Sequence, residues 1–465
     1  MPLHRQVAGD GAGGGADLSL NPLYASTAER TPVPKRRIPQ VGLDPDVAYQ
    51  VVRDELILDG NARLNLATFV TTWMEPQAEL LMSVAADKNI VDKDEYPQSA
   101  EIERRCVDIL ADLWHAPAEG GGLGTSTTGS SEAAMLAGMA MKWRWRQRAG
   151  GAGGNRPNLV LGSNAQICWE KFCRYWEVEP RLVPMQIGRL HLTADEAVRR
   201  CDENTIGVVA ILGSTQDGSF EPVAEIGAAL DALESGGGPS IPVHVDAASG
   251  GFVAPFVQPD LEWDFRVPRV ASINASGHKY GLVYPGVGWV VWRRHEDLPE
   301  DLVFHVNYLG GMMPTFSLNF SRPGAQVIAQ YYCLLRLGFE GYRRVQQAAL
   351  DVASHLSSTI AGLGPFELLT DGHELPVFAF RLKPDVTRYT VFDVSEALRK
   401  HGWQVPAYNL PPDLEDVAVL RIVVRNGFSR DLADALLADL RHEITLLEHV
   451  PAPIPPQYAR HPFHH

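Results

Sequence analysis

Short, almost unbroken apolar runs recur along the middle of this 465-residue chain, and amphipathic segments separate them. Such runs are typical of parallel strands that are covered by helices on both faces. Between the runs, residues 194–201 and 223–233 have the spacing of amphipathic helices. The pattern predicts an α/β domain on a mostly parallel sheet. The predicted strands lie at residues 158–162, 207–213, 242–247, 270–273 and 286–292.

The chain divides into three predicted parts. Residues 1–60 begin with a glycine-rich stretch and contain a predicted helix over 45–58, so we expect an N-terminal arm. Residues 61–346 hold the apolar runs and form the predicted large domain. A long helical pattern over 325–360 leads into a smaller α/β domain with a proline-rich tail, predicted over 347–465. Its expected strands are 377–382 and 417–424, and its expected helices are 394–401 and 432–449.

The charge balance and the cysteines exclude several classes of protein. The formal net charge of −15 argues against nucleic acid or an anionic membrane as the main partner. The five cysteines show no metal-ligand grouping, so we expect reduced thiols, no metal site and a cytoplasmic location. No apolar stretch reaches the roughly 20 residues that span a bilayer, and the first residues lack the apolar core of a signal peptide.

A lysine and an aspartate follow two of the apolar runs. Lys279 stands among small residues in SINASGHKY (272–280), and Asp246 lies at the end of the run in PVHVDAA (242–248). A lysine amine can form a Schiff base with an aldehyde, and a carboxylate can hold a proton on a pyridine nitrogen. The pair therefore predicts a site for pyridoxal 5'-phosphate. The alternative is a surface ion pair, which is what most lysine–aspartate pairs are.

A third feature is the change from small, hydroxylated residues to a helical pattern at 124–135, with Ser130 and Ser131 at the junction. Backbone N–H groups and hydroxyls at a helix start form a site for anions. This segment therefore predicts a phosphate site. The alternative is that the two serines only cap the helix.

These features and several short motifs resemble the glutamate decarboxylases of bacteria and plants, which are pyridoxal phosphate enzymes of fold type I. The resemblance implies an aspartate aminotransferase-like fold, with a seven-stranded sheet in the large domain. It also implies decarboxylation of L-glutamate to 4-aminobutyrate and CO2 with uptake of a proton. The motifs are LNLAT (64–68), DKDEYPQSA (92–100), TGSSEA (128–133), QICW (166–169), KF (171–172), HVDAASGGFVAPF (244–256), SINASGHKYG (272–281) and NFSRP (319–323).

The resemblance implies a role for individual residues. Lys279 carries the cofactor, Asp246 pairs with its ring nitrogen, and His278 and Tyr308 complete the catalytic group. The implied cofactor-binding residues are Ser130, Ser131, Gln166, Thr215, Asp246, His278 and Lys279, together with Ser321 of the partner subunit. The implied substrate-binding residues are Thr68, Phe69 and Arg425, joined by Asn89 and Asp92 from across a dimer interface.

Several of these residues also have a purely structural interpretation. Arg425 follows a predicted strand and can belong to an ion pair. Asn89 and Asp92 can be turn residues, as Asn and Asp often are. Gln166 can be a hydrogen-bonding residue at a strand end.

Two positions depart from the family pattern, and the tail raises a separate hypothesis. Glu170 stands where histidine is common, which would place a negative charge near the cofactor, and Gln216 stands where an aromatic residue is expected. The terminal His464 and His465 can titrate near neutral pH, so a tail that blocks the site is a hypothesis and an irregular tail is the alternative.

The resemblance implies a homodimer at minimum, and a homohexamer is an open alternative. The basic, tryptophan-containing calmodulin-binding tail of the plant enzymes is absent from this sequence. Three other functions stay open at this point. They are decarboxylation of another amino acid (aspartate, cysteine sulfinate or an aromatic one), an aminotransferase, and a catalytically silent scaffold of the same fold.

Overall fold

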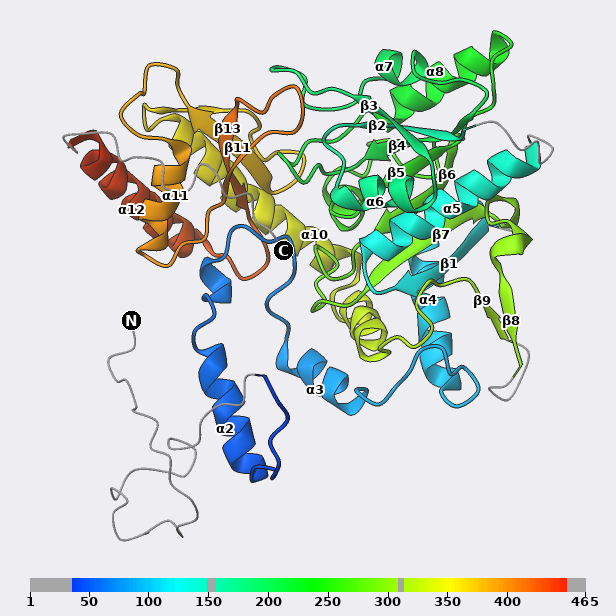
Figure 1. Ribbon diagram of the computed structural model, residues 1–465, viewed down its shortest axis with the longest axis horizontal. Helices are drawn as coiled ribbons and strands as arrows, with labels where there is room; N and C mark the ends of the chain where they lie inside the picture. The colour runs from blue at the N-terminus through cyan, green and yellow to red at the C-terminus, as the bar shows by residue number, and fades with distance from the viewer. Residues whose placement is uncertain (1–35, 120, 149–155, 308–312, 450–465) are drawn as a thin grey trace. The chain divides into compact units, whose positions relative to one another are not determined.

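The computed structural model describes residues 36–119, 121–148, 156–307 and 313–449 (Figure 1). The chain forms two compact units, Met1–Asn61 and Ala62–His465, and each is described by itself. Within the described ranges, no helix has the length and apolar character needed to cross a membrane.

In the first unit, helix α2 spans Pro45–Leu56. The Asp44 side chain accepts a hydrogen bond from the backbone N–H of Asp46 at 3.0 Å and so caps the helix start. Pro45 suits the first helical position, where no backbone N–H is required. The helix predicted over 45–58 is therefore present, and it ends at Leu56.

The second unit contains a seven-stranded sheet with the order β1-β7-β6-β5-β4-β2-β3. Four of the six neighbouring strand pairs are parallel, and β7 runs antiparallel to both of its neighbours. The mostly parallel seven-stranded sheet that the family resemblance implies is thereby confirmed. Its strands are β1 (Gly121–Thr127), β2 (Asn158–Gly162), β3 (Glu179–Val183), β4 (Thr205–Ile211), β5 (Val243–Asp246), β6 (Val270–Ala275) and β7 (Gly288–Arg294).

Helices surround this sheet (Figure 1). They are α3 (Pro76–Val84), α4 (Pro97–Leu113), α5 (Ser130–Arg148), α6 (Ile167–Tyr175), α7 (Ala194–Val198), α8 (Val223–Ser235), α9 (Ala254–Val257) and α10 (Ala325–Ala361). Short 3-10 turns lie at Ala62–Leu64, Gly250–Phe252, His295–Asp297 and Glu300–Leu302, and β8 (Phe304–Val306) pairs antiparallel with β9 (Met313–Thr315).

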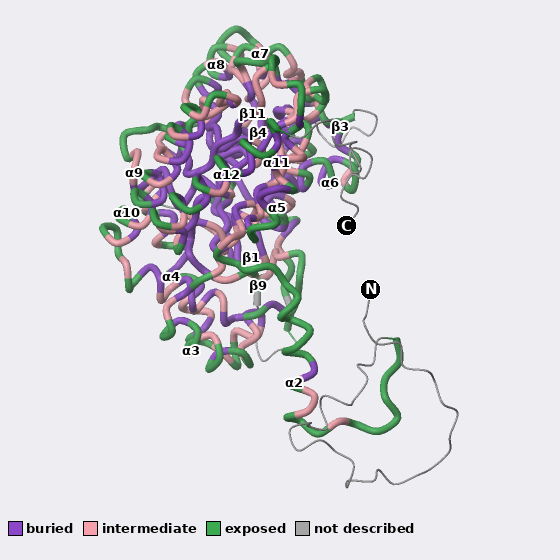
Figure 2. Tube along the Cα trace, turned by 90° about the vertical axis from the view of Figure 1, so that its left-hand side faces the viewer, coloured by how far each residue is buried: buried purple, intermediate pink, exposed green. Residues whose placement is uncertain are grey.

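Successive strand residues belong to two hydrophobic cores, because side chains alternate between the faces of a sheet. In β4, Val208 and Ala210 join the core that includes α4, α8 and α10, whereas Val209 and Ile211 join the core that includes α5 and α6. Every residue of β4 is buried, as Figure 2 shows in purple. This two-sided burial explains why the parallel strands appear in the sequence as unbroken apolar runs.

A smaller four-stranded antiparallel sheet has the order β10-β11-β13-β12. Its strands and its helices α11 and α12 enclose a separate hydrophobic core. The end of α10 contributes to that core through Ala353 and Leu356, whereas the start of α10 packs in the core of the large sheet. The elements are β10 (Phe366–Leu368), β11 (Val377–Leu382), α11 (Val391–Arg399), β12 (Ala407–Asn409), β13 (Ala418–Val423) and α12 (Arg430–His449). The domain boundary at residue 346 stays a prediction.

Helix α10 changes direction at Gly338, where φ is 58° and ψ is −173°. Residues with a side chain adopt this backbone conformation only with strain, so glycine suits the kink. Gly338 therefore joins two helical stretches of α10, one packed against each sheet.

The sequence pattern does not predict two of the seven strands. β1 consists of glycine, serine, threonine and one leucine, residues that give no apolar run. A Cβ atom at Gly124 would lie 2.6 Å from the Val290 carbonyl oxygen, so the close pairing with β7 requires glycine there. β3 is an edge strand whose residues are largely exposed, so it also lacks the signal of a buried strand.

Candidate active site

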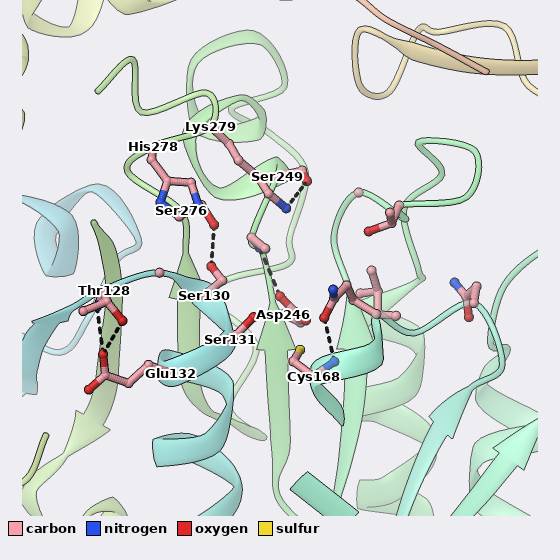
Figure 3. A pocket seen from close by; sticks show the side chains of 17 residues that line it. Thr128, Ser130, Ser131, Glu132, Cys168, Asp246, Ser249, Ser276, His278 and Lys279 are labelled. Carbon is pink, nitrogen blue, oxygen red and sulfur yellow. Dashed lines mark hydrogen bonds between the residues drawn. The ribbon is translucent and has the colours of Figure 1, made fainter. Parts of the chain in front are cut away.

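A cavity of about 250 Å³ lies at the carboxyl ends of the parallel strands, beside the first turn of α5 (Figure 3). β5 ends at Asp246, and Lys279 follows the end of β6 after a short loop. Ligands of open α/β sheets bind at this edge because the strand ends and their loops meet there. The wall includes seven of the predicted cofactor residues: Ser130, Ser131, Gln166, Thr215, Asp246, His278 and Lys279.

The Lys279 amine donates a hydrogen bond to Ser249 Oγ at 3.2 Å (Figure 3). Burial lowers the pKa of Lys279, the nearby Asp246 carboxylate opposes that shift, and the positive charge of Arg421 adds to it. A lowered pKa increases the share of neutral amine, which is the nucleophilic form.

The two Asp246 oxygens are both hydrogen-bonded. Oδ2 accepts a bond from the Trp169 indole N–H at 2.8 Å. Oδ1 accepts bonds from Asn274 Nδ2 at 3.0 Å and from the backbone N–H of Ala248 at 3.2 Å. These three donors fix the orientation of the carboxylate.

The start of α5 is held in place by Glu132. Its Oε2 accepts hydrogen bonds from the backbone N–H and the hydroxyl of Thr128 at 2.8 and 2.9 Å. The Ser276 hydroxyl donates to Ser130 Oγ at 2.7 Å (Figure 3). The turn before the helix is thereby fixed, and the helix start with Ser130 and Ser131 faces the cavity. This arrangement suits an anion such as a phosphate group.

The helix start and the His278 imidazole approach closely. A Cβ atom at Gly129 would lie 2.8 Å from His278 Cε1, so no side chain can stand between them. Burial, together with the charge of Lys279, lowers the pKa of His278 to about 4. His278 Nδ1 accepts a bond from the backbone N–H of Gly286 at 3.4 Å, which leaves the proton of the neutral ring on Nε2. The helix start with Gly129, Ser130 and Ser131 forms a cradle for an anion. Together with Lys279 and Asp246, this helix-start cradle fits pyridoxal phosphate.

Gln166 and Thr215 also lie in the cavity wall. The Gln166 side chain accepts a hydrogen bond from the Cys168 backbone N–H at 2.6 Å, so it caps α6 as well. Glu170 lies elsewhere, because its side chain is 55% exposed and pairs with Arg174 at 2.8 Å. The expectation that Glu170 places a charge near the cofactor is wrong, since Glu170 follows the cavity-lining Cys168 by two residues, about half a helical turn, and so faces solvent on the other side of α6.

The segment of residues 65–72 runs beside Lys279. The Thr71 hydroxyl donates to the Lys279 carbonyl at 2.6 Å, and the Thr71 N–H donates to the His278 carbonyl at 2.8 Å. The Lys279 amine lies 5.2 Å from the centre of the Phe69 ring. Thr68 Oγ1 accepts a bond from the Val70 N–H at 3.1 Å. Thr68 and Phe69 thus belong to a segment close to the reactive amine, although neither lies in the cavity wall.

Two buried arginines of the small sheet region hold this segment. Arg425 donates to the carbonyls of Val70, Asn65 and Ala62 and to the Thr72 hydroxyl. Burial lowers the pKa of Arg425. These bonds give Arg425 a structural role, and its predicted role in binding a substrate carboxylate stays a prediction.

Arg421 is a charged residue that the sequence analysis does not single out. Its guanidinium donates to the Thr215 and Ala67 carbonyls and lies 5.0 Å from the centre of the Phe69 ring. Phe69 thus has Lys279 and Arg421 as cationic neighbours. The sequence signal was a charged residue in the middle of the apolar strand β13, because arginine is rarely buried without a partner.

The residues expected to act across an interface lie together outside the wall of the cavity. Asn89 Nδ2 donates to Ser321 Oγ at 3.2 Å, and Asn89 Oδ1 accepts from the Arg322 N–H at 3.0 Å. The backbone N–H of Asp92 donates to the Asn89 carbonyl at 3.1 Å. Tyr308, His464 and His465 lie outside the described residues.

The sheet order, the lysine after β6, the aspartate at the end of β5 and the helix-start cradle define a pyridoxal phosphate enzyme of fold type I. Comparison with known proteins agrees. Residues 39–383 match the model of the pyridoxal-dependent decarboxylase conserved domain. The chain belongs to the pyridoxal-dependent decarboxylase family.

Similar proteins narrow the comparison. The chain is 52% identical to a glutamate decarboxylase of Aliivibrio fischeri, with 100% of this chain and 97% of that protein covered. It is 51% identical to a glutamate decarboxylase of Solanum lycopersicum, with 96% and 89% covered. Among solved structures, a Lactobacillus brevis glutamate decarboxylase is 47% identical, with a TM-score of 0.88 over 93% of this chain and 99% of that one.

Proposed function

We propose that this protein is a decarboxylase that removes the α-carboxyl group of L-glutamate with pyridoxal 5'-phosphate as cofactor. The products are CO2 and 4-aminobutyrate, and each turnover consumes a proton. The observation that carries the proposal is the cavity that brings Lys279, Asp246 and the start of α5 together. The nearly full-length identity to glutamate decarboxylases supports glutamate as the substrate.

The residues of the cavity have distinct tasks in this reaction. Bound pyridoxal phosphate supplies an electron sink for the pair of electrons that the departing CO2 leaves at the α-carbon. Lys279 provides the amine that holds the cofactor, and its lowered pKa makes the neutral amine more available. Asp246 would hold a proton on the ring nitrogen. Ser130, Ser131 and His278 would bind the phosphate.

The residues at the substrate end would orient the carboxylates of glutamate. Lys279 and Arg421 both lie beside the Phe69 ring, and the positive charge of Arg421 acts on the Lys279 amine. Guanidinium groups bind carboxylates through two parallel hydrogen bonds. We therefore propose Arg421 as a second candidate for binding a substrate carboxylate, beside Arg425, for which the family resemblance implies this role, while Thr68 and Phe69 would hold the distal carboxylate.

We further propose that the active unit is at least a homodimer in the cytoplasm, with a homohexamer as the alternative. Asn89, Asp92 and Ser321 would then complete the site of the neighbouring subunit. The hydrogen bond between Asn89 and Ser321 supports this, because it groups them on one surface outside their own cavity. Sedimentation of the loaded enzyme tests the assembly, and full activity in a monomer would contradict it.

The test of the reaction uses the protein loaded with pyridoxal phosphate and L-glutamate between about pH 4 and about pH 7. CO2 and 4-aminobutyrate are expected in equal amounts, with no activity in Lys279→Ala. A keto acid product would indicate an aminotransferase instead. Visible absorbance of the lysine-bound cofactor without any product from glutamate would keep the cofactor assignment and reject the substrate.

A further inference from the structure

A line of buried polar side chains lies behind Asp246, on the two strands β5 and β6. Asn274 Oδ1 is 2.7 Å from His244 Nε2, and His244 Nδ1 is 2.8 Å from Ser272 Oγ. His244 and Asn274 are fully buried, and Ser272 is 1% exposed. The mechanism above does not use these three residues.

The strand register explains why the residues meet. β5 and β6 are parallel, with His244 opposite Ser272 and Asp246 opposite Asn274. Residues two apart on a strand point to the same side of the sheet, so all four side chains share one face. The polar side chains that alternate with apolar ones along the two strands therefore form a single cluster in space.

The direction of each hydrogen bond follows from the chemistry of the groups. The Asn274 amide nitrogen donates to Asp246 Oδ1, so the amide oxygen faces His244 Nε2. That oxygen can only accept, which requires the imidazole proton on Nε2. In the neutral ring Nδ1 then accepts, and the Ser272 hydroxyl donates to it. Every donor in the line points toward Asp246.

The charge state of the imidazole agrees with this direction. Burial lowers the pKa of His244 to about 4, against the opposing effect of the Asp246 carboxylate. The ring is therefore neutral above about pH 4. Trp169 covers the same cluster, because its ring centroid lies 5.2 Å from that of His244 while its N–H donates to Asp246 Oδ2.

We propose that Ser272, His244 and Asn274 are positioning residues that form a one-way hydrogen-bond relay to Asp246, and that this relay keeps the proton on the ring nitrogen of bound pyridoxal phosphate. The proposal rests on the cofactor assignment and is independent of the identity of the substrate. A buried carboxylate that accepts hydrogen bonds from fixed donors keeps its orientation. Asp246 would then keep the orientation in which it pairs with the ring nitrogen. Loss of the relay would let the carboxylate turn or take up the proton itself.

The experiment measures directly whether the ring nitrogen of the cofactor is protonated. The enzyme is reconstituted with pyridoxal phosphate labelled with ¹⁵N in the ring, and solid-state NMR reports whether that nitrogen carries a proton. Wild type is expected to show the protonated signal. Asn274→Leu removes the donor to Asp246, so its signal is expected at the unprotonated position, with cofactor affinity weakened on the order of tenfold.

Changes at His244 separate hydrogen bonding from packing. His244→Phe keeps a ring but removes both polar atoms, so its signal is expected to shift in the same direction as that of Asn274→Leu. His244→Gln can still donate to Asn274 from its amide nitrogen, so its signal is expected close to wild type. A His244→Phe spectrum identical to that of wild type would contradict the relay.

A matched control is Asn158→Leu. Asn158 is also a fully buried asparagine of this sheet, but its partners are Asp202 and Thr205 at the other end of the strands. Its ring-nitrogen signal is expected to stay at the wild-type position. A shift as large as that of Asn274→Leu would mean that general damage to the sheet moves the signal, and would overturn the proposal.

A second measurement uses the unchanged protein and does not depend on any variant folding. With ¹⁵N-labelled histidine, His244 is expected as the neutral form that carries its proton on Nε2. A proton on Nδ1, or on both nitrogens, would overturn the relay. If labelled pyridoxal phosphate failed to bind wild type at all, the cofactor assignment would fall and the relay with it.

Discussion

The sheet edge that carries Asp246 and Lys279 and the segment of residues 65–72 are built in different ways. At the sheet edge, neighbouring strands bond the functional groups to one another, as Asn274 does for Asp246. The segment instead depends on the small sheet, because the Val423 N–H donates to the Leu66 carbonyl and two arginines bind its backbone. Cofactor binding is thus a property of one sheet, whereas the substrate end requires both.

The sharpest test of this difference is Arg421→Met. Removal of a buried guanidinium that binds a carboxylate costs several kcal/mol, so kcat/KM for glutamate is expected to fall about 10³-fold. Cofactor affinity is expected to fall much less, because Arg421 contacts the cavity wall only through the Thr215 carbonyl. Steady-state kinetics and cofactor titration measure the two quantities. Arg421→Lys serves as the control, since it keeps the charge without the paired donors. Equal losses of both quantities would remove the distinction between the two regions.

Arg425→Met is expected to act on stability. Its guanidinium satisfies three backbone carbonyls and the Thr72 hydroxyl, and their loss is expected to lower the free energy of unfolding by about 4 kcal/mol. Denaturant unfolding of the loaded enzyme measures this. A stable variant with a greatly raised KM would instead support the direct role in carboxylate binding that the family resemblance implies.

The buried Glu221 beside the large sheet makes the free energy of unfolding depend on pH. Burial raises the pKa of Glu221 from 4.5 to about 7, and the charge of Asp217 adds to the shift. The folded protein thus holds this proton more tightly than the unfolded chain, so the stabilisation is complete below the unfolded pKa and is lost as the pH rises through about 7. Between these two pH values wild type is expected to lose about 3 kcal/mol relative to Glu221→Gln.

Denaturant unfolding at a series of pH values gives the slope for both proteins. The slope is the informative quantity, because Glu221 accepts bonds from the Leu192 and Ile211 N–H groups and glutamine shifts the curve as a whole. Parallel curves for wild type and Glu221→Gln would show that Glu221 titrates normally.

The smallest expected effect concerns α10, the helix that packs against both sheets. Gly338→Ala places a side chain at φ 58° and ψ −173°, where a Cβ atom meets no other atom within 4 Å. The cost is therefore conformational and is expected to be about 1 to 2 kcal/mol of unfolding free energy. Gly236→Ala is the control, because Gly236 has an ordinary φ of −78°. Equal stability of the two variants would show that the kink relaxes without cost.

The sequence predicted the parts of the site that follow apolar runs. Asp246 ends β5 and Lys279 comes shortly after β6, and the parallel arrangement of the two strands brings both residues to one edge. Arg421 and the relay escaped prediction for the opposite reason. Their polar side chains lie within strands, and only the strand register shows that His244 faces Ser272. Glu170 was misplaced because helical rotation, not sequence distance, decides which residues of α6 face the cavity.

By itself, the sequence determined the α/β fold class, the family and the chemistry of the cofactor site. Apolar runs, a helix start and a reactive lysine are local features. Local features involve residues that are neighbours in the chain, so they can be recognised in the sequence alone. The tertiary structure decided which polar residues share a face, which arginine lies beside Phe69 and which carboxylates are buried. Those outcomes depend on contacts between residues tens or hundreds of positions apart, and such contacts exist only after the strands have paired.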